Sequence, residues 1–226
     1  FHLSRRQKGF GRGGRMKIEK DTAEIYSGVR LGHTIGAPIG LLIKNLDNVN
    51  WENIMPINPI NPTPEKITLP RPGHADLAGV MKHDFDDIRN VIERSSARET
   101  AMRVAIGSVC RKLLKEVRVE VGSRVIQIHD ISDDSMIDLN KGAELISLEA
   151  DRSDVRCINQ IKSDSMKKTI DKAKKLGDSV GGKFEVFATG VPIGLGSYSQ
   201  WFDRLQSKIS ESIMSINAIK GIEFSN

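Results

Sequence analysis

Arg71-Pro-Gly-His-Ala-Asp76 is the stretch around which the rest of the chain is interpreted. It is followed closely by Glu93-Arg-Ser-Ser-Ala-Arg-Glu-Thr100. It places a histidine in a Pro-Gly turn and then a Ser-x-x-Glu spacing that fits a capping box, which predicts a helix beginning near Ser96. Small and apolar side chains recur beyond it at helical spacing. A helix start offers free N–H groups and a positive dipole end, and Arg94 and Arg98 lie beside this one. The stretch therefore predicts a site for a phosphate or another anion.

The composition is that of an ordinary soluble protein, with 38% hydrophobic and 28% charged residues among 226. No apolar run approaches the roughly 18 residues that a membrane helix needs, so we expect no contact with a membrane. Cys110 and Cys157 lie far apart without metal-ligand spacing, which predicts reduced thiols, no metal site and a cytoplasmic location. The length suits one large domain or two small ones.

Both ends of the chain look cut. It opens at Phe1 without a methionine or a signal-peptide pattern, and it closes with a glycine helix stop followed by strand-like residues. We therefore expect residues 1–226 to form a single, incomplete domain of a longer protein.

Positive charge is concentrated at the beginning of the chain. The net charge is +5, and the first twenty residues hold seven Lys or Arg against one acid. Residues 5–15 form a glycine-punctuated basic loop, which could bind nucleic acid, a membrane surface or a small phosphorylated ligand, or could be a solvated tail. Only Phe10 interrupts this loop with an aromatic ring, so the stacking platforms of single-stranded nucleic-acid binders are not visible. Small anionic ligands are favoured.

The expected elements give an α+β protein with mainly antiparallel sheets. The proline-rich residues 50–70 should be irregular. Alternation predicts two strands on either side of Gly122-Ser123, and the helix near residues 163–176 should have a serine cap. The predicted strands cover 17–19, 24–29, 38–45, 117–121, 124–128 and 183–189, and the predicted helices cover 96–113, 140–147, 163–176 and 203–219.

A protonated imidazole beside an anion site suits general-acid chemistry, which makes His74 the candidate catalytic residue. Asp76 could orient His74 or cap a following turn. Asn217 lies on or near the apolar face of the last predicted helix, where a ligand could satisfy it. His33 and His83 lack a recognisable partner. The residues alone indicate a protein that binds a phosphorylated small molecule, and they leave open whether it is an enzyme.

Six motifs can be compared with those of known families. They are Arg71-Pro-Gly-His-Ala-Asp, Arg94-Ser-Ser-Ala-Arg-Glu-Thr, Arg5-Arg-Gln-Lys-Gly-Phe-Gly-Arg, Gly177-Asp-Ser-Val-Gly-Gly, Gly190-Val-Pro-Ile-Gly-Leu-Gly-Ser and Met214-Ser-Ile-Asn-Ala-Ile-Lys-Gly-Ile-Glu-Phe224. Taken in their order along the chain they resemble the motifs of the chorismate synthases, and the resemblance extends from about Ser4 to Phe224, nearly the whole chain.

The resemblance implies a carbon–oxygen lyase that eliminates phosphate in a 1,4-anti sense from 5-enolpyruvylshikimate 3-phosphate. The product is chorismate, at the last step of the shikimate pathway to the aromatic amino acids. The family needs reduced FMN without net redox change, with NADPH or an external reductase supplying the reduced flavin. It also implies a β-α-β sandwich, with long helices between antiparallel sheets, and a homotetramer. A non-catalytic basic module that binds nucleic acid or a phosphorylated ligand is the alternative, and we expect no nucleic acid as partner.

By the same resemblance, His74 corresponds to the histidine that protonates the reduced flavin. The FMN contacts correspond to Arg94, Ser95, Ser96, Asn217 and Ala218, and the NADP or substrate contacts to Arg6 and Arg12.

The chain lacks three motifs of the family pattern and departs from it at one further residue. The upstream Gly-Glu-Ser-His-Gly motif, with another catalytic histidine, and the downstream Lys-Pro-Thr-Ser-Ser and Arg-His-Asp-Pro-Cys motifs are not among its residues, and Ser225 stands where glycine is usual. The 226 residues alone are therefore not expected to be a competent enzyme.

Overall fold

The computed structural model describes residues 1–13, 18 and 20–225. They form two compact units: Phe1–Lys17 with Val104–Asn226, and Ile18–Arg103. Each unit is described by itself. No helix among the described residues is long and apolar enough to cross a membrane.

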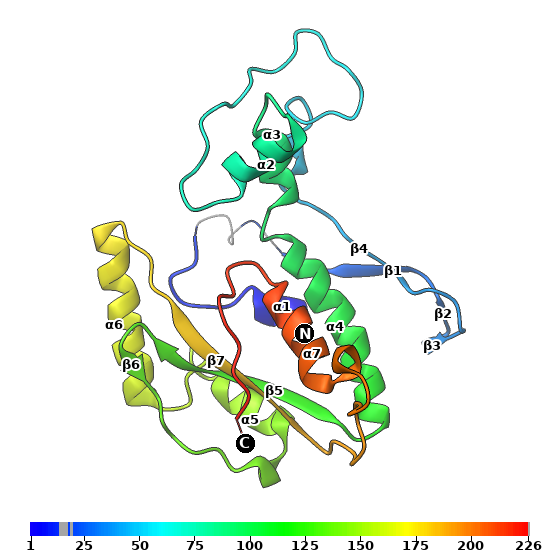
Figure 1. Cartoon of the computed structure of the whole chain (residues 1–226), viewed down its shortest axis with the longest axis vertical. Helices are drawn as coiled ribbons and strands as arrows, with labels where there is room; N and C mark the ends of the chain where they lie inside the picture. The colour runs from blue at the N-terminus through cyan, green and yellow to red at the C-terminus, as the bar shows by residue number, and fades with distance from the viewer. Residues whose placement is uncertain (14–17, 19, 226) are drawn as a thin grey trace. The chain divides into compact units, whose positions relative to one another are not determined.

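The first unit contains a three-stranded antiparallel sheet in the order β6-β5-β7 (Figure 1). The strands are β5 (Glu120–Ile128), β6 (Ile131–Ser132) and β7 (Gly182–Thr189). The prediction of two strands around Gly122-Ser123 is wrong, because β5 runs through both residues. A Cβ on Gly122 would lie 2.3 Å from the carbonyl oxygen of Ala143 and 2.4 Å from Cε2 of Phe187. This glycine permits close packing in a strand rather than a turn.

Two helices cover this sheet: α5 (Ala143–Ala150) packs on β5 and β7, and α6 (Gln160–Leu176) packs on β6 and β5 (Figure 1). The predicted serine cap of α6 is wrong, since the side chain of Asn159 accepts from the N–H of Lys162. Ser163 is buried inside the helix, with its hydroxyl 2.7 Å from that of Ser153. Fully buried Met166 packs there with Val155 and Cys157.

The remaining elements of the first unit are short, apart from α4. They are α1 (His2–Arg6), α4 (Glu99–Glu116, which begins in the second unit), η3 (Leu139–Lys141), η4 (Trp201–Asp203) and α7 (Leu205–Met214). Helix α7 ends five residues before the predicted boundary at residue 219. Asn217 therefore lies in an exposed turn and not on an apolar helix face.

The second unit confirms the predicted antiparallel pairing of residues 24–29 with 38–45. Its elements are β1 (Ala23–Ser27) with β4 (Gly40–Ile43), β2 (Val29–Arg30) with β3 (His33–Thr34), η2 (Asn48–Asn50), α2 (Asp76–His83) and α3 (Arg89–Arg94). The strand expected at 17–19 lies outside the described residues, as does Arg15 of the basic loop. The proline-rich residues are irregular, as predicted. The α+β class with antiparallel sheets is confirmed.

Helices α2 and α3 have no counterpart among the predicted elements, and they pack closely against each other. A Cβ on Gly79 would lie 2.4 Å and 2.8 Å from the two γ-methyl groups of Val91, which is 7% exposed. Glycine therefore sets the separation of the two helices. This pair carries the candidate site, because His74 lies just before α2 and Arg94 ends α3.

Candidate active site

The turn at residues 71–76 is held by an ion pair between its own ends. The guanidinium of Arg71 donates from Nε to Oδ2 of Asp76 (2.8 Å) and from Nη2 to Oδ1 (2.9 Å), and the backbone N–H of Arg71 donates to Oδ2 (2.9 Å). The Asp76 side chain is fully buried, whereas that of Arg71 is 45% exposed. Gly73 occupies the left-handed region with a φ of 72°, which glycine adopts without strain. The turn is therefore fixed at three points.

The Asp76 carboxylate accepts its hydrogen bonds from Arg71 and not from His74. Hydrogen bonding from the Arg71 side chain is the main cause that lowers the pKa of Asp76 to about 2, against the opposing effect of desolvation. The carboxylate is charged throughout the physiological range. Neither role expected for Asp76, orienting His74 or capping a turn, describes this arrangement.

His74 is oriented by the turn itself. Its Nδ1 lies 3.0 Å from the carbonyl oxygen of Pro72. Because a carbonyl oxygen only accepts, Nδ1 carries the hydrogen, and the neutral ring keeps its lone pair on Nε2. The side chain is exposed, and Nε2 has no partner among the described residues. His74 can therefore gain or give a proton at an outward-facing nitrogen.

The segment Arg94-Ser95-Ser96 connects two helices. Arg94 is the last residue of α3, and α4 begins only at Glu99. The predicted capping box is wrong: the hydroxyl of Ser96 accepts from the N–H of Arg98 at 3.3 Å, and Glu99 pairs with Arg103 at 3.0 Å. Arg94 is exposed, and its side chain has no partner among the described residues.

Arg98 has a structural partner that the sequence did not indicate. Its guanidinium donates to both carboxylate oxygens of Asp21, at 2.8 Å and 3.2 Å, and to the carbonyl oxygen of Lys44 at 3.1 Å. The Asp21 side chain is fully buried. No local pattern reveals a pair whose members lie 77 residues apart. Of the two arginines expected beside the anion site, Arg98 is bound to Asp21 and Lys44 within the second unit, and Arg94 is the exposed one.

The other predicted site residues belong to the first unit. Arg6 ends α1, and Arg12 donates to the carbonyl oxygens of Arg6 and Lys8. Asn217 and Ala218 are exposed in the turn after α7, where Ala218 has a φ of 67°. That these residues join His74 and Arg94 around one ligand stays a prediction.

Fold and site together define an α+β protein that presents an exposed histidine on a turn fixed by an ion pair and an exposed arginine at the end of a helix, as suits the binding of a small anion. The family model for chorismate synthase matches residues 1–226, and the chain belongs to that family.

Similar proteins cover almost all of the chain. Over 98% of this chain, the sequence is 52% identical to the chorismate synthase of Chlorobium luteolum. It is also 52% identical to the chorismate synthase of Alkaliphilus metalliredigens, again over 98% of this chain. A crystal structure of chorismate synthase superposes with a TM-score of 0.76 and 39% identity, covering 97% of this chain. The chain spans 57% of the length of each of these three proteins.

Proposed function

We propose that the protein to which this chain belongs is a chorismate synthase, the lyase that eliminates phosphate from 5-enolpyruvylshikimate 3-phosphate to give chorismate. The observation that carries this proposal is the exposed Nε2 of His74 on a turn clamped by Arg71 and Asp76. Membership of the family supplies the reaction, and the hydrogen-bonded turn positions the side chain that we propose as its general acid.

His74 is the proposed proton donor. With Nδ1 held by the carbonyl oxygen of Pro72, only Nε2 is left to exchange a proton with a ligand. The Asp76 carboxylate, neutralised by Arg71, keeps the turn in shape as pH changes, because its pKa of about 2 is far below the range in which an imidazole titrates.

The FMN site is proposed at Arg94, Ser95 and Ser96, completed by Asn217 and Ala218. An exposed guanidinium without a protein partner among the described residues fits a phosphate, and hydroxyls beside it can donate to further oxygens. Reduced FMN supplies electron density to the substrate transiently when bound, without net redox change. Arg6 and Arg12 are proposed to contact NADPH, as the flavin reductant, or the substrate.

We further propose that residues 1–226 belong to a single domain of a cytoplasmic homotetramer built as a β-α-β sandwich. The nucleic-acid alternative has less support. In the basic loop, Arg5 is already engaged by Asp151 and Ser147, and Arg12 by backbone carbonyls, which leaves fewer cations to follow a phosphate backbone.

The test is turnover by the complete protein. With 5-enolpyruvylshikimate 3-phosphate and reduced FMN under anaerobic conditions, we expect chorismate and phosphate in equal amounts. Oxidised FMN is the control and should give neither product. If the FMN-loaded, reduced protein binds substrate and releases no phosphate, the proposed function is wrong.

A further inference from the structure

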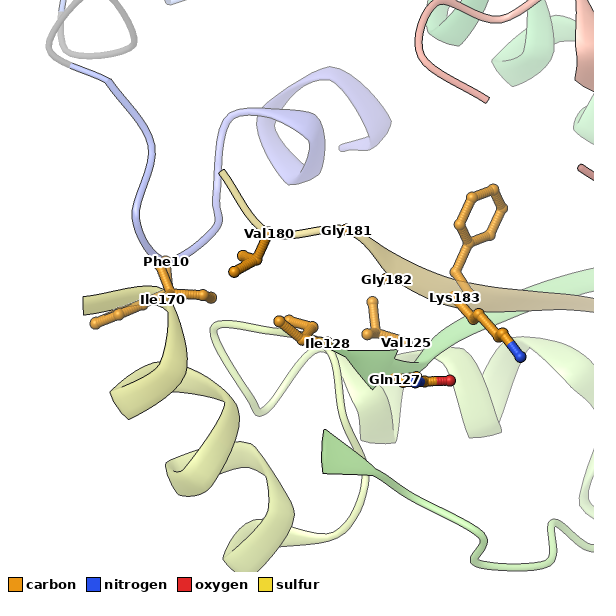
Figure 2. Close-up of a pocket in the computed structure, with 10 residues that line it drawn as sticks. Phe10, Val125, Gln127, Ile128, Ile170, Val180, Gly181, Gly182 and Lys183 are labelled. Atoms are coloured by element: carbon orange, nitrogen blue, oxygen red, sulfur yellow. The ribbon is translucent and has the colours of Figure 1, made fainter. Parts of the chain in front are cut away.

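Two hollows in the first unit meet at Phe10, and together they form one groove with unlike ends. The larger has a volume of about 400 Å³, and its lining is mainly apolar: Phe10, Val125, Ile128, Ile170, Val180 and Phe184. The second, of about 300 Å³, shares Phe10, Ile128 and Ile170 with it. Figure 2 shows Phe10 beside Ile170 at one end of the larger hollow, Val180 facing Ile128 across it, and Lys183 at the other end.

The second hollow is cationic. Four basic side chains line it against two acids, Asp151 and Asp154. Asp151 is shared between Arg5 and Arg156, so that one carboxylate faces two guanidinium groups. Burial, followed by the charge of Arg5, lowers the pKa of Arg156 to about 10, as expected where positive charge is not fully compensated.

Two lysines flank the apolar part without a side-chain partner among the described residues. Lys8 lies at the cationic end and Lys183 at the opposite end, and both are exposed. An apolar hollow with a few placed polar groups is the usual form of a small-molecule site, and its volume is in the range of such sites. The charge at both ends excludes cations and favours anions.

We propose that the groove around Phe10 binds a small amphipathic monoanion, a single aromatic ring that carries a carboxylate. The ring lies in the apolar hollow against Phe10, Ile128 and Ile170, where offset or edge-on contact with Phe10 is available. The carboxylate faces Lys183 or Lys8. This site is additional to the proposed function, and it shares one residue with it: Arg12, which lines the second hollow, is also proposed above to contact NADPH or the substrate.

Phenylacetate is the probe, and phenylacetamide is its uncharged counterpart with the same ring. The complete protein, with oxidised FMN bound so that no turnover occurs, is titrated while the Ile and Val methyl resonances are recorded by NMR. We expect saturable binding of phenylacetate with a dissociation constant of about 1 mM, as suits a ligand of this size. The methyl groups of Ile128 and Ile170 should shift, and phenylacetamide should bind about threefold more weakly or worse.

Variants locate the site. Phe10→Ala should weaken phenylacetate binding by about tenfold through loss of the ring contact, and Lys183→Gln by about threefold through loss of an exposed charge. Lys112→Gln is the matched control, because Lys112 is an exposed lysine of α4 outside the groove and should change nothing. If Phe10→Ala does not fold, the comparison of phenylacetate with phenylacetamide on the wild-type protein still tests the proposal.

Three results would overturn the proposal: no saturable binding of phenylacetate, equal affinity for the acid and the amide, or displacement of phenylacetate by saturating 5-enolpyruvylshikimate 3-phosphate. The last would make the groove part of the substrate site. FMN and substrate binding are followed in the same samples, so failure of this inference is distinguishable from failure of the lyase proposal.

Discussion

Replacing Gly79 with alanine perturbs the packing that places the candidate site. Gly79 lies inside α2, and its Cα faces the γ-methyl groups of Val91 in α3. A Cβ there would lie 2.4 Å from the nearer methyl carbon, whereas ordinary contact begins at 3.4 Å. Helix α3, whose last residue is Arg94, must therefore retreat from α2 by about 1 Å.

Two effects of opposite sign set the magnitude. Alanine in place of an interior helical glycine gains about 0.5–1 kcal/mol. Overpacking against a buried side chain costs about 1–3 kcal/mol. The clash dominates, and we expect a net loss of about 1–2 kcal/mol in the free energy of unfolding. A displacement of about 1 Å between His74 and Arg94 should also lower kcat by up to 10²-fold.

Denaturant unfolding and steady-state turnover of the complete protein measure both quantities. Gly107→Ala is the matched control: Gly107 lies inside α4, and its Cβ would meet no atom within 4 Å, so alanine should stabilise by about 0.5–1 kcal/mol. Adding Val91→Ala to Gly79→Ala removes both clashing methyl groups and should recover about 1–2 kcal/mol as a favourable coupling. If Gly79→Ala is as stable and active as wild type, or shows no coupling to residue 91, the reasoning is refuted.

Three further predictions concern single side chains. His74→Ala should lower turnover by about 10²-fold or more, as loss of a general acid does. The control His83→Ala, at the last residue of α2, should keep turnover near that of wild type. Near-normal turnover of the His74 variant would remove the catalytic role of His74. The depressed pKa of Asp76, about 2, means that its ion pair stabilises the turn above the ordinary carboxyl pKa and is lost as pH falls through about 2. A ¹³C NMR titration of Asp76 should therefore show no midpoint above pH 3, and a midpoint near 3.9 would contradict the clamp. Burial, then the bond to a buried aspartate, raises the pKa of the Cys157 thiol to about 11. Iodoacetamide at about pH 8 should therefore modify exposed Cys110 and leave Cys157 unmodified, as measured by peptide mapping of these two sites. Fast modification of Cys157 would count against this placement.

Local patterns predicted the sheet elements well, because alternation and turn chemistry are written in neighbouring residues. The pairing of residues 24–29 with 38–45 and the strand at 183–189 are both present. Local patterns failed where packing against an element distant in the sequence decides the local structure. Gly122 reads as a turn residue, yet it is the place where α5 and Phe187 approach a continuous strand. Nothing next to it in the sequence contains that information.

The site was predicted in the same uneven way. The motifs located His74 and Arg94, and the structure shows both exposed, His74 in the turn before α2 and Arg94 at the last residue of α3. The clamp from Arg71 to Asp76 and the pair between Arg98 and Asp21 were missed, because an ion pair is a property of three-dimensional distance.

A single-turnover experiment tests the central claim most directly. The complete wild-type protein and its His74→Ala variant, each in excess over 5-enolpyruvylshikimate 3-phosphate and loaded with reduced FMN, are mixed anaerobically, and phosphate release is followed with time. We predict one phosphate per substrate from wild type, and release slower by about 10²-fold from a variant that still binds substrate and flavin. No phosphate from wild type, or equal rates from the two proteins, would contradict the account.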